Sequence, residues 1–495
     1  MGGAEASPII YTLLFCRNKD IIVTYYGKAG NGMENITNEV PRRRPVRRKK
    51  TKWQIFKEAY LPTIIVAVTI ILVIWFIIGG AIRRNRTDDS IETTPPTPST
   101  EATNLASRYQ EEITGLLERA AAAAQDYDYE SAATILSSFS GNMEDYPQLQ
   151  AIYENYLEII NNMVIWDDPS KIPTLSFHVL IENADLAYKD SQYGSSYKKN
   201  FITTAQFRSI LEQLYDNGCV LVDMQDVYED VYDESTGKFG YQPKALALPA
   251  GKTPIMLVQT QVNYYQYMTD GRKDGLPDGF ASKLCVDENG KFYNEMPLSD
   301  GAIANGDYDM VPILEEFIAN HKDFSYHGAR AILGITAYDG IFGYRVNSSA
   351  LSSEELAQEQ AEAARLVEAL QKAGYRIACY SYNNTNYTNQ AASEIQADLR
   401  SWELAVKPLL GGMETDILIF AKEGDIASME EVYTGSKYNV LYNAGYRFFM
   451  SVSSQGYSQI GEQYVRHNRL QITGSYLKDH ADWYDGLFDA ASLLG

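Results

Sequence analysis

Polar and aromatic side chains gather in this sequence where apolar, strand-like runs end. Tyr and Asn prevail there, and they suit sugar recognition because aromatic rings stack on apolar sugar faces and amides bond to hydroxyls. The candidate binding residues are His178, Asn263, Tyr264, Tyr265, Tyr382 and Asn383. Four more residues at the same strand ends are Thr260, Gln261, Tyr380 and Asn384. Since the chain holds 37 tyrosines, packing is the alternative explanation for most of the aromatic ones.

The elements that must position these residues alternate between strand and helix. Apolar runs of strand character and amphipathic stretches follow one another after residue 174, which favours a parallel α/β arrangement. Strands are expected at 175–181, 219–224, 254–259, 331–336, 375–380, 417–421 and 447–452, and helices at 203–217, 311–320, 353–372, 394–410 and 429–444. Such a series is typical of a β/α barrel, in which function collects at the carboxyl ends of the strands. Insertions are expected at 238–252 and, as a hairpin, at 283–294.

Several short segments occur in an order that resembles a known family. They are Phe201-Ile-Thr-Thr before the first helix, Leu214-Tyr-Asp-Asn-Gly218 at its end, Val262-Asn-Tyr-Tyr265 after a strand, and Gly343-Tyr-Arg345. With the strand ends above, this order resembles the polysaccharide deacetylase family of carbohydrate esterases over about residues 170–475. The resemblance implies a deformed (β/α)7 barrel.

The resemblance also implies a metal site. Active members of that family hold a divalent cation with one aspartate and the two histidines of a His-x-x-x-His, and a second, adjacent aspartate acts as the base. The aspartate positions correspond here to Thr260 and Gln261, and the histidine positions to Tyr380 and Asn384. Neutral amides are poor zinc ligands, and four neutral residues bring no charge to offset dehydration of a cation. We therefore expect no catalytic residue, no metal and no cofactor.

Two further positions depart from the family pattern. Phe420-Ala-Lys-Glu stands where the family has an arginine-and-proline segment, and Thr473 stands where an acidic residue is usual. The alternative to lost catalysis is an active deacetylase or hydrolase with a displaced site that uses His178, Asp339 or His467. For His467, which Arg466 and Arg469 flank, a surface position is favoured over the pocket.

Other groups of charged residues have simpler explanations. The carboxylates around His480 lie on an amphipathic C-terminal stretch and are expected to form a solvated face rather than a metal cluster. Asp287-Glu-Asn-Gly290 lacks the later ligands of a calcium loop and is expected to form a hairpin turn. Cys219, Cys285 and Cys379 lie in apolar runs and are expected to be buried small hydrophobes rather than a disulfide framework.

Charge is distributed unevenly along the 495 residues, whose formal net charge is −21. Residues 1–86 hold 15 Lys and Arg and 5 Asp and Glu, so this part is +10 and the rest is −31. Residues 61–82 are uncharged and long enough to cross a hydrocarbon core of about 30 Å. Because a run rich in Arg and Lys precedes them, the N-terminus is expected in the cytoplasm and the main domain outside. The acidity of that domain argues against a nucleic-acid partner.

These features predict the organisation of a single-pass plasma-membrane protein. Its parts are a basic cytoplasmic region (1–60), a transmembrane helix (61–82), a Thr/Pro-rich stalk (83–103), a helical spacer (104–165) and the deacetylase-like domain (166–495). Translation is expected to begin at Met33, because residues 1–32 do not resemble the start of such an anchor.

The helical spacer resembles a tetratricopeptide unit. Apolar residues recur at helical spacing at Leu105, Tyr109, Ile113, Leu116 and Ala120. Packing on the next domain is favoured over recruitment of a protein partner, which would make the chain a scaffold. The sequence thus predicts a membrane-anchored, extracytoplasmic, catalytically inactive deacetylase-like protein that binds cell-envelope polysaccharide or peptidoglycan.

Overall fold

The computed structural model describes residues 13–17, 20–24, 100–189, 193–269, 276–413 and 415–494. The chain divides into two compact units, Met1–Ile91 and Glu92–Gly495. In the first, β1 (Leu13–Arg17) and β2 (Asp20–Thr24) form an antiparallel hairpin. No helix among the described residues is long and apolar enough to cross a membrane. The predicted span at 61–82 and the predicted start at Met33 lie outside the described residues.

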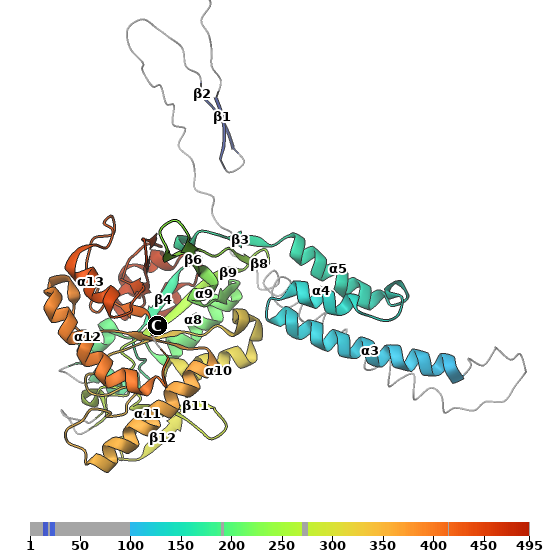
Figure 1. Ribbon diagram of the computed structural model, residues 1–495. Coiled ribbons are helices and arrows are strands. Elements are labelled where there is room, and N and C mark those ends of the chain that lie inside the picture. Colours follow the sequence, from blue (N-terminus) through green and yellow to red (C-terminus); the bar gives the residue numbers. More distant parts are fainter. Residues whose placement is uncertain are drawn as a thin grey trace, which may run out of the picture. The chain divides into compact units, whose positions relative to one another are not determined.

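The helical spacer consists of α3 (Thr100–Gln125), α4 (Tyr129–Ser137) and α5 (Pro147–Asn161), which lie side by side (Figure 1). Ile113, Leu116 and Leu136 form much of its small core. Helix α3 begins inside the predicted stalk. Pro98 is the last proline before it, and every residue of the helix can therefore donate its backbone N–H.

A parallel sheet forms the centre of the main domain. Its parallel strands are β4 (Thr174–Phe177), β9 (Thr253–Thr260), β13 (Ile332–Ile335), β14 (Arg376–Cys379), β15 (Ile417–Ile419) and β16 (Phe448–Met450). Strand β18 (Val465–His467) pairs with β16, and β19 (Leu470–Gln471) pairs with β4 at the other end of this series. Because two residues separate β18 from β19, one segment joins both ends of the sheet. An α/β domain with a curled sheet that fits a deformed barrel is therefore confirmed.

Helices cover the outer face of this sheet (Figure 1). They include α8 (Thr204–Asp216), α10 (Met310–Asn320), α11 (Ser353–Ala373), α12 (Ala392–Val406) and α13 (Gly435–Asn443). Alternate strand residues face opposite sides, so that Leu257 packs in the core that contains the helices and Val258 packs in a second core inside the barrel. The prediction of a helix over 429–444 is wrong in its first turn and a half, because Gly435 is the first helical residue and a loop precedes it.

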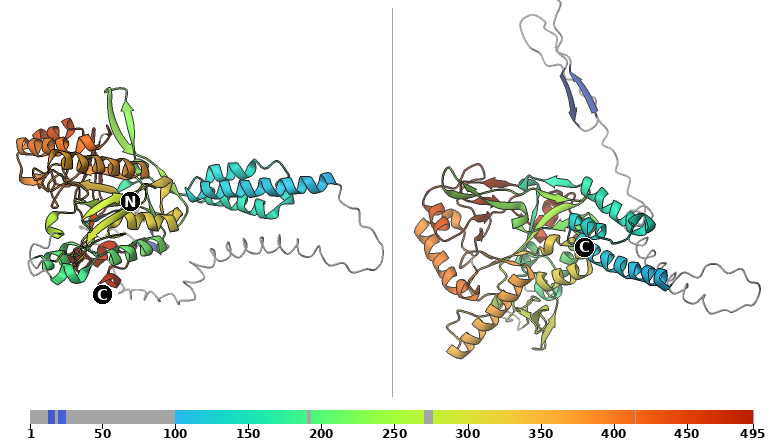
Figure 2. Two further views of the ribbon diagram at one scale, coloured as in Figure 1. Left: turned by 90° about the horizontal axis from the view of Figure 1, so that it is seen from below. Right: turned by 45° about the vertical axis from the view of Figure 1, so that its right-hand side comes forward.

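Smaller elements decorate the barrel. Strand β5 (Cys219–Leu221) extends the sheet along β9, β17 (Ser458–Ile460) pairs with β18, and β3 (Val164–Trp166) pairs with β8 (Leu246–Leu248). The short helices are α6 (Ala184–Lys189), α7 (Gly194–Asn200), α9 (Met224–Val227) and α14 (Gly474–Asp479). The hairpin of β6 (Tyr228–Asp233) and β7 (Lys238–Pro243) stands out from the domain in Figure 2.

The predicted hairpin at 283–294 is confirmed. Strands β10 (Lys283–Val286) and β11 (Phe292–Pro297) are antiparallel, and β12 (Ile303–Gly306) extends them. Between the first two, the Asp287 carboxylate accepts hydrogen bonds from the N–H groups of Asn289 and Lys291, each at 2.8 Å. The three cysteines of the main domain are buried and unpaired, as their apolar setting predicts.

Tyr127 connects the helical spacer to the barrel. It has a left-handed backbone conformation after α3, with φ of 66°, and only 6% of its surface is exposed. Its hydroxyl donates a hydrogen bond of 2.6 Å to the carbonyl of Asp323, and its ring lies 5.7 Å from that of Tyr326. The spacer thus packs on the domain that follows it.

Replacing Tyr127 therefore tests this contact. Tyr127→Phe should lower the free energy of unfolding by about 1 kcal/mol, because the partly buried Asp323 carbonyl loses the hydrogen bond from the Tyr127 hydroxyl. Tyr127→Ala should cost about 3 to 5 kcal/mol through the cavity that it leaves. Denaturant titration of both variants measures this, with Tyr232→Phe on the exposed hairpin as the control. Equal stability of Tyr127→Ala and wild type would contradict the packing.

Candidate functional site

A cavity of about 550 Å³ opens where the carboxyl ends of the parallel strands meet. Residues at or just after β4, β9, β14, β15, β16 and β19 form its walls, and residues of α7 and α14 complete them. The lining residues are His178, Lys199, Asn200, Gln261, Tyr380, Lys422, Glu423, Val452, Arg469, Gln471, Thr473, Ser475 and Tyr476. This is the end of the barrel at which the sequence predicts a site.

The four positions that the family resemblance marks lie around this mouth. Thr260 is fully buried, and its hydroxyl lies 2.8 Å from Nδ1 of His178 and 3.2 Å from the Phe177 carbonyl. Asn384 donates a hydrogen bond of 3.2 Å to the amide oxygen of Gln261. Tyr380 lines the cavity with Gln261. The structure thus brings together residues that the sequence separates by more than a hundred positions.

A second cavity of about 340 Å³ adjoins the first, because Gln261 and Lys422 line both. Its other lining residues are Tyr265, Tyr267, Tyr338, Asp339, Asn383 and Asn384. The rings of Tyr265 and Tyr267 stack at 5.8 Å with an interplanar angle of 15°, and Tyr338 is 53% exposed. The two cavities together form a groove, which is named the mouth groove below.

Three predicted binding residues do not line either cavity. The side chain of Asn263 is buried and bonds to both backbone groups of Thr336. Tyr264 donates a hydrogen bond of 2.6 Å to the buried carboxyl of Asp309. The Tyr382 hydroxyl accepts a bond from Asn347. These residues hold loops around the groove, whereas His178, Tyr265 and Asn383 lie in it.

The residues of a displaced catalytic site do not meet. Asp339 lines the second cavity, but its carboxylate accepts a bond of 2.8 Å from the Gln266 N–H and lies 3.6 Å from Arg345. His467 is buried instead of lying on the surface, with its nitrogens 2.7 Å from the Tyr228 hydroxyl and 3.1 Å from the Ile172 carbonyl. The reason is strand alternation, which turns Val465 and His467 of β18 into the barrel core.

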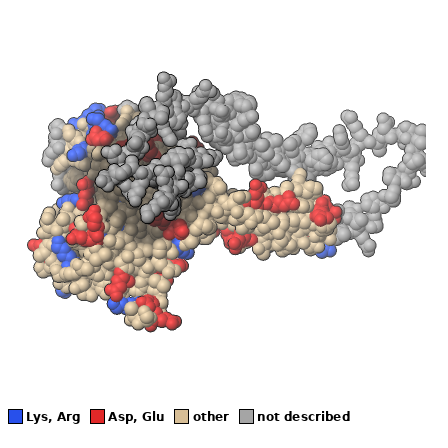
Figure 3. All heavy atoms as spheres, turned by 90° about the horizontal axis from the view of Figure 1, so that it is seen from above, with Lys and Arg blue, Asp and Glu red and all other residues tan. Residues whose placement is uncertain are grey.

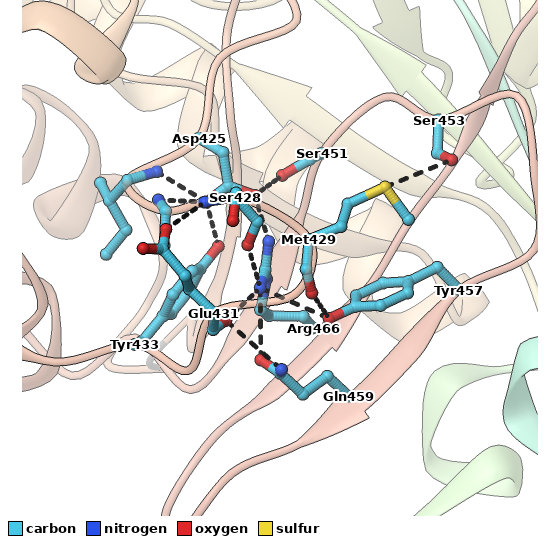
Figure 4. A network of polar contacts seen from close by, with 12 residues as sticks. Asp425, Ser428, Met429, Glu431, Tyr433, Ser451, Ser453, Tyr457, Gln459 and Arg466 are labelled. Atoms are coloured by element: carbon cyan, nitrogen blue, oxygen red, sulfur yellow. Dashed lines mark hydrogen bonds and ion pairs between the residues drawn. The ribbon is translucent and has the colours of Figure 1, made fainter.

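A buried arginine fixes the loop that brings Lys422 and Glu423 to the groove. Arg466 bonds to the Asp425 carboxylate at 2.9 Å and to the carbonyls of Ser428 and Glu431 at 3.0 and 2.9 Å (Figure 4). Its guanidinium also lies 4.5 Å from the centre of the Tyr433 ring. This network keeps residues 425–433 out of α13, which explains the late start of that helix.

Several cationic and polar residues of the groove were not predicted from the sequence as site residues, among them Lys422, Arg469 and Gln471. Segment 465–471 is too polar to be recognised as a strand, so its inward-facing residues could not be assigned. Strand periodicity could have identified them, because residues 465, 467, 469 and 471 lie on one face of an extended chain.

The groove does not offer a metal site of the kind that the resemblance implies. No group of three His, Cys, Asp or Glu side chains that could hold a metal ion occurs within the described part of the chain. The amides of Gln261 and Asn384 bond to one another, and the Thr260 hydroxyl is enclosed. These donors do not fit a divalent cation, which favours carboxylate and imidazole.

The fold and groove define a class: an α/β barrel with a polar and aromatic cleft at the carboxyl ends of its strands. No protein-family model matches this chain, and no curated protein matches it significantly. Among solved structures it is similar to the Streptococcus pyogenes deacetylase PplD in complex with acetate, with 12% identity, a TM-score of 0.32, and coverage of 62% of this chain and 94% of that one. It is also similar to a de-N-acetylase from Aggregatibacter actinomycetemcomitans, with 12% identity, a TM-score of 0.33, and coverage of 61% and 95%.

The protonation of His178 decides how it can act. Burial lowers the pKa of His178 to about 4, and the charge of Arg469 acts in the same direction. Burial also lowers the pKa of His467 to about 4. Both imidazoles are therefore neutral at pH 7, far from the range in which a general acid or base works best.

We predict that both histidines remain neutral at pH 5.5, where an unperturbed imidazole with pKa near 6.5 is about 90% protonated. Because the unfolded chain takes up these protons first, stability should fall as the pH drops from about 7 to 4. Histidine NMR measures the titration, with His178→Asn and His467→Asn to assign the signals. A midpoint near 6.5 for either residue would contradict the prediction.

Proposed function

We propose that this protein is a membrane-anchored, extracytoplasmic, polysaccharide-deacetylase-like protein that binds cell-envelope glycan and lacks metal-dependent catalysis. The observation that carries the proposal is the mouth groove, in which a tyrosine-lined cavity adjoins four neutral residues at the positions of the family's catalytic centre. The segment order of the sequence supports the family, and the apolar residues 61–82 support the anchor.

The second cavity suits sugar rings. Tyr265, Tyr267 and Tyr338 offer aromatic surface, and Asn383, Asn384 and Gln261 offer amides beside it. The apolar faces of sugars can stack on such rings, and the amides can donate to and accept from sugar hydroxyls. An open groove with both kinds of group favours a chain of sugars over a compact apolar ligand.

The first cavity does not suit a metal-dependent hydrolase. Arg469 and Lys422 line it, and positive charges disfavour a divalent cation. The neutral His178 bonds to the buried Thr260 hydroxyl, so neither group is presented as a nucleophile and base pair. Both features support the proposed loss of the family's reaction.

Binding is tested with a tetrasaccharide of β-1,4-linked N-acetylglucosamine. Calorimetry should show binding to the full chain, and Tyr267→Ala should weaken it about fivefold, the equivalent of about 1 kcal/mol. Tyr232→Ala, which removes an exposed tyrosine outside both cavities, is the matched control and should bind as wild type does.

The same protein preparation tests the absence of catalysis. We expect substoichiometric zinc by mass spectrometry and no release of acetate from the tetrasaccharide, with or without added zinc. Stoichiometric zinc together with steady turnover would show that catalysis is retained. No binding of the tetrasaccharide by the wild type would count against glycan recognition.

A further inference from the structure

Arg469 is buried at the mouth groove and forms no direct ion pair with the described residues. It is 1% exposed, and its guanidinium bonds to the Phe420 carbonyl and the Ser176 hydroxyl, each at 3.0 Å, and to the amide oxygen of Gln471. All three acceptors are neutral, and no carboxylate lies within 4.0 Å of it among the described residues. Burial of a charge whose hydrogen-bond acceptors are all neutral is unfavourable unless something opposes it.

Arg466 shows how the same fold treats a structural arginine. It is equally buried and lies three residues earlier on the same segment, yet it pairs with Asp425 at 2.9 Å. The two side chains point to opposite sides of the strand, one into the loop network of Figure 4 and the other toward the cavity. Burial alone therefore does not explain why, of these two arginines, Arg466 has an ion pair and Arg469 has none among the described residues.

Further donors line the cavity beside Arg469. Nε of Arg469 and Nε2 of Gln471 are buried and have no acceptor among the described residues. Lys422 and Lys199 also line the cavity, and both are exposed and form no ion pair with the described residues. Glu423 is the one carboxylate in the lining, and it accepts a bond from the Tyr476 hydroxyl. The lining of this cavity thus carries three cations and one carboxylate.

This cationic cavity stands out against an acidic protein. The chain has a net charge of −21, and Figure 3 shows Asp and Glu side chains spread over the visible face. An acidic surface repels anions. A local excess of positive charge on it can therefore bind the negative group of a ligand at one defined position.

From these contacts we propose that the first cavity binds an oxyanion, a carboxylate or phosphate carried by an acidic glycan, with Arg469 and Lys422 as its counter-charges. The inference rests on the proposed glycan binding and specifies it: neutral sugars occupy the tyrosine-lined cavity, and the charged group occupies the cavity next to it. Gln471 and Lys199 supply further donors.

The test compares three probes with the full chain by calorimetry. They are the neutral N-acetylglucosamine tetrasaccharide, a tetrasaccharide that alternates glucuronic acid with N-acetylglucosamine, and an oligomer of glycerol phosphate. We expect the uronic-acid probe to bind about tenfold more tightly than the neutral one at low salt. Near 1 M salt, where the screening length is about 3 Å, this preference should shrink.

Two variants locate the effect. Lys422→Gln, at an exposed position, should reduce the preference for the acidic probe about fivefold, and Arg469→Gln should abolish it. Lys198→Gln removes the same charge from the residue next to Lys199 but outside the cavity, and should leave the preference unchanged. Thermal melting confirms folding of each variant, and a folded Lys422→Gln suffices if Arg469→Gln unfolds.

The outcomes separate the two proposals. Equal affinity for neutral and acidic saccharides overturns the oxyanion site and leaves glycan binding intact. Binding of the glycerol phosphate oligomer alone supports the oxyanion site with phosphate as its ligand and overturns glycan binding. A preference that Lys422→Gln and Lys198→Gln reduce equally overturns the site, because it would then reflect general surface charge.

Discussion

Pairing of residues 465–471 with both β16 and β4 is the constraint on which this domain depends. Parallel strands need long connections, and an open end of such a sheet leaves backbone donors and acceptors unpaired. Here one extended segment satisfies both ends, with a further bridge between Val452 and Arg469. Strands β4, β16, β18 and β19 are short, so the side chains of residues 465–471 also take part in joining the two ends of the sheet. Charged residues of this segment therefore lie inside the domain.

The same constraint shapes the loops at the mouth. Within the described part of the chain, ten non-glycine residues have positive φ, and eight of them follow β9, β13, β14 or β15. These eight include Gln261, Asp339, Asn384 and Lys422. Each such conformation costs about 1 kcal/mol or more and persists where neighbouring contacts determine it. The Asn384–Gln261 bond and the Arg466 network are contacts of this kind. Strain is thus concentrated at the groove, as is common at sites that hold a ligand in a fixed geometry.

Much of the fold could be predicted because apolar runs and helix signals are local. The helix expected at 353–372 is observed as Ser353–Ala373, since Ser352 and Glu355 form a capping box and Gly374 ends it. The site was less predictable. Asn263, Tyr264 and Tyr265 all follow the same strand. The left-handed backbone conformation of Tyr264 turns the chain, and the Tyr264 hydroxyl bonds to Asp309, which is distant in the sequence. The place of Arg469 in the groove was not predicted, because the orientation of its side chain depends on how the segment 465–471 pairs with both ends of the sheet.

The charge of the mouth links the proposed loss of metal chemistry to the proposed ligand. A divalent cation and a buried guanidinium repel strongly in a cavity of low dielectric, so a site cannot hold both without acidic residues between them. The four positions that would supply those residues are Thr260, Gln261, Tyr380 and Asn384, and all are neutral. With these four positions neutral, Glu423 is the one carboxylate that lines the cavity beside Arg469, Lys422 and Lys199, and an anionic group of the ligand can balance the remaining positive charge. The proposed loss of metal chemistry and the proposed oxyanion site would then both follow from the charge of the groove.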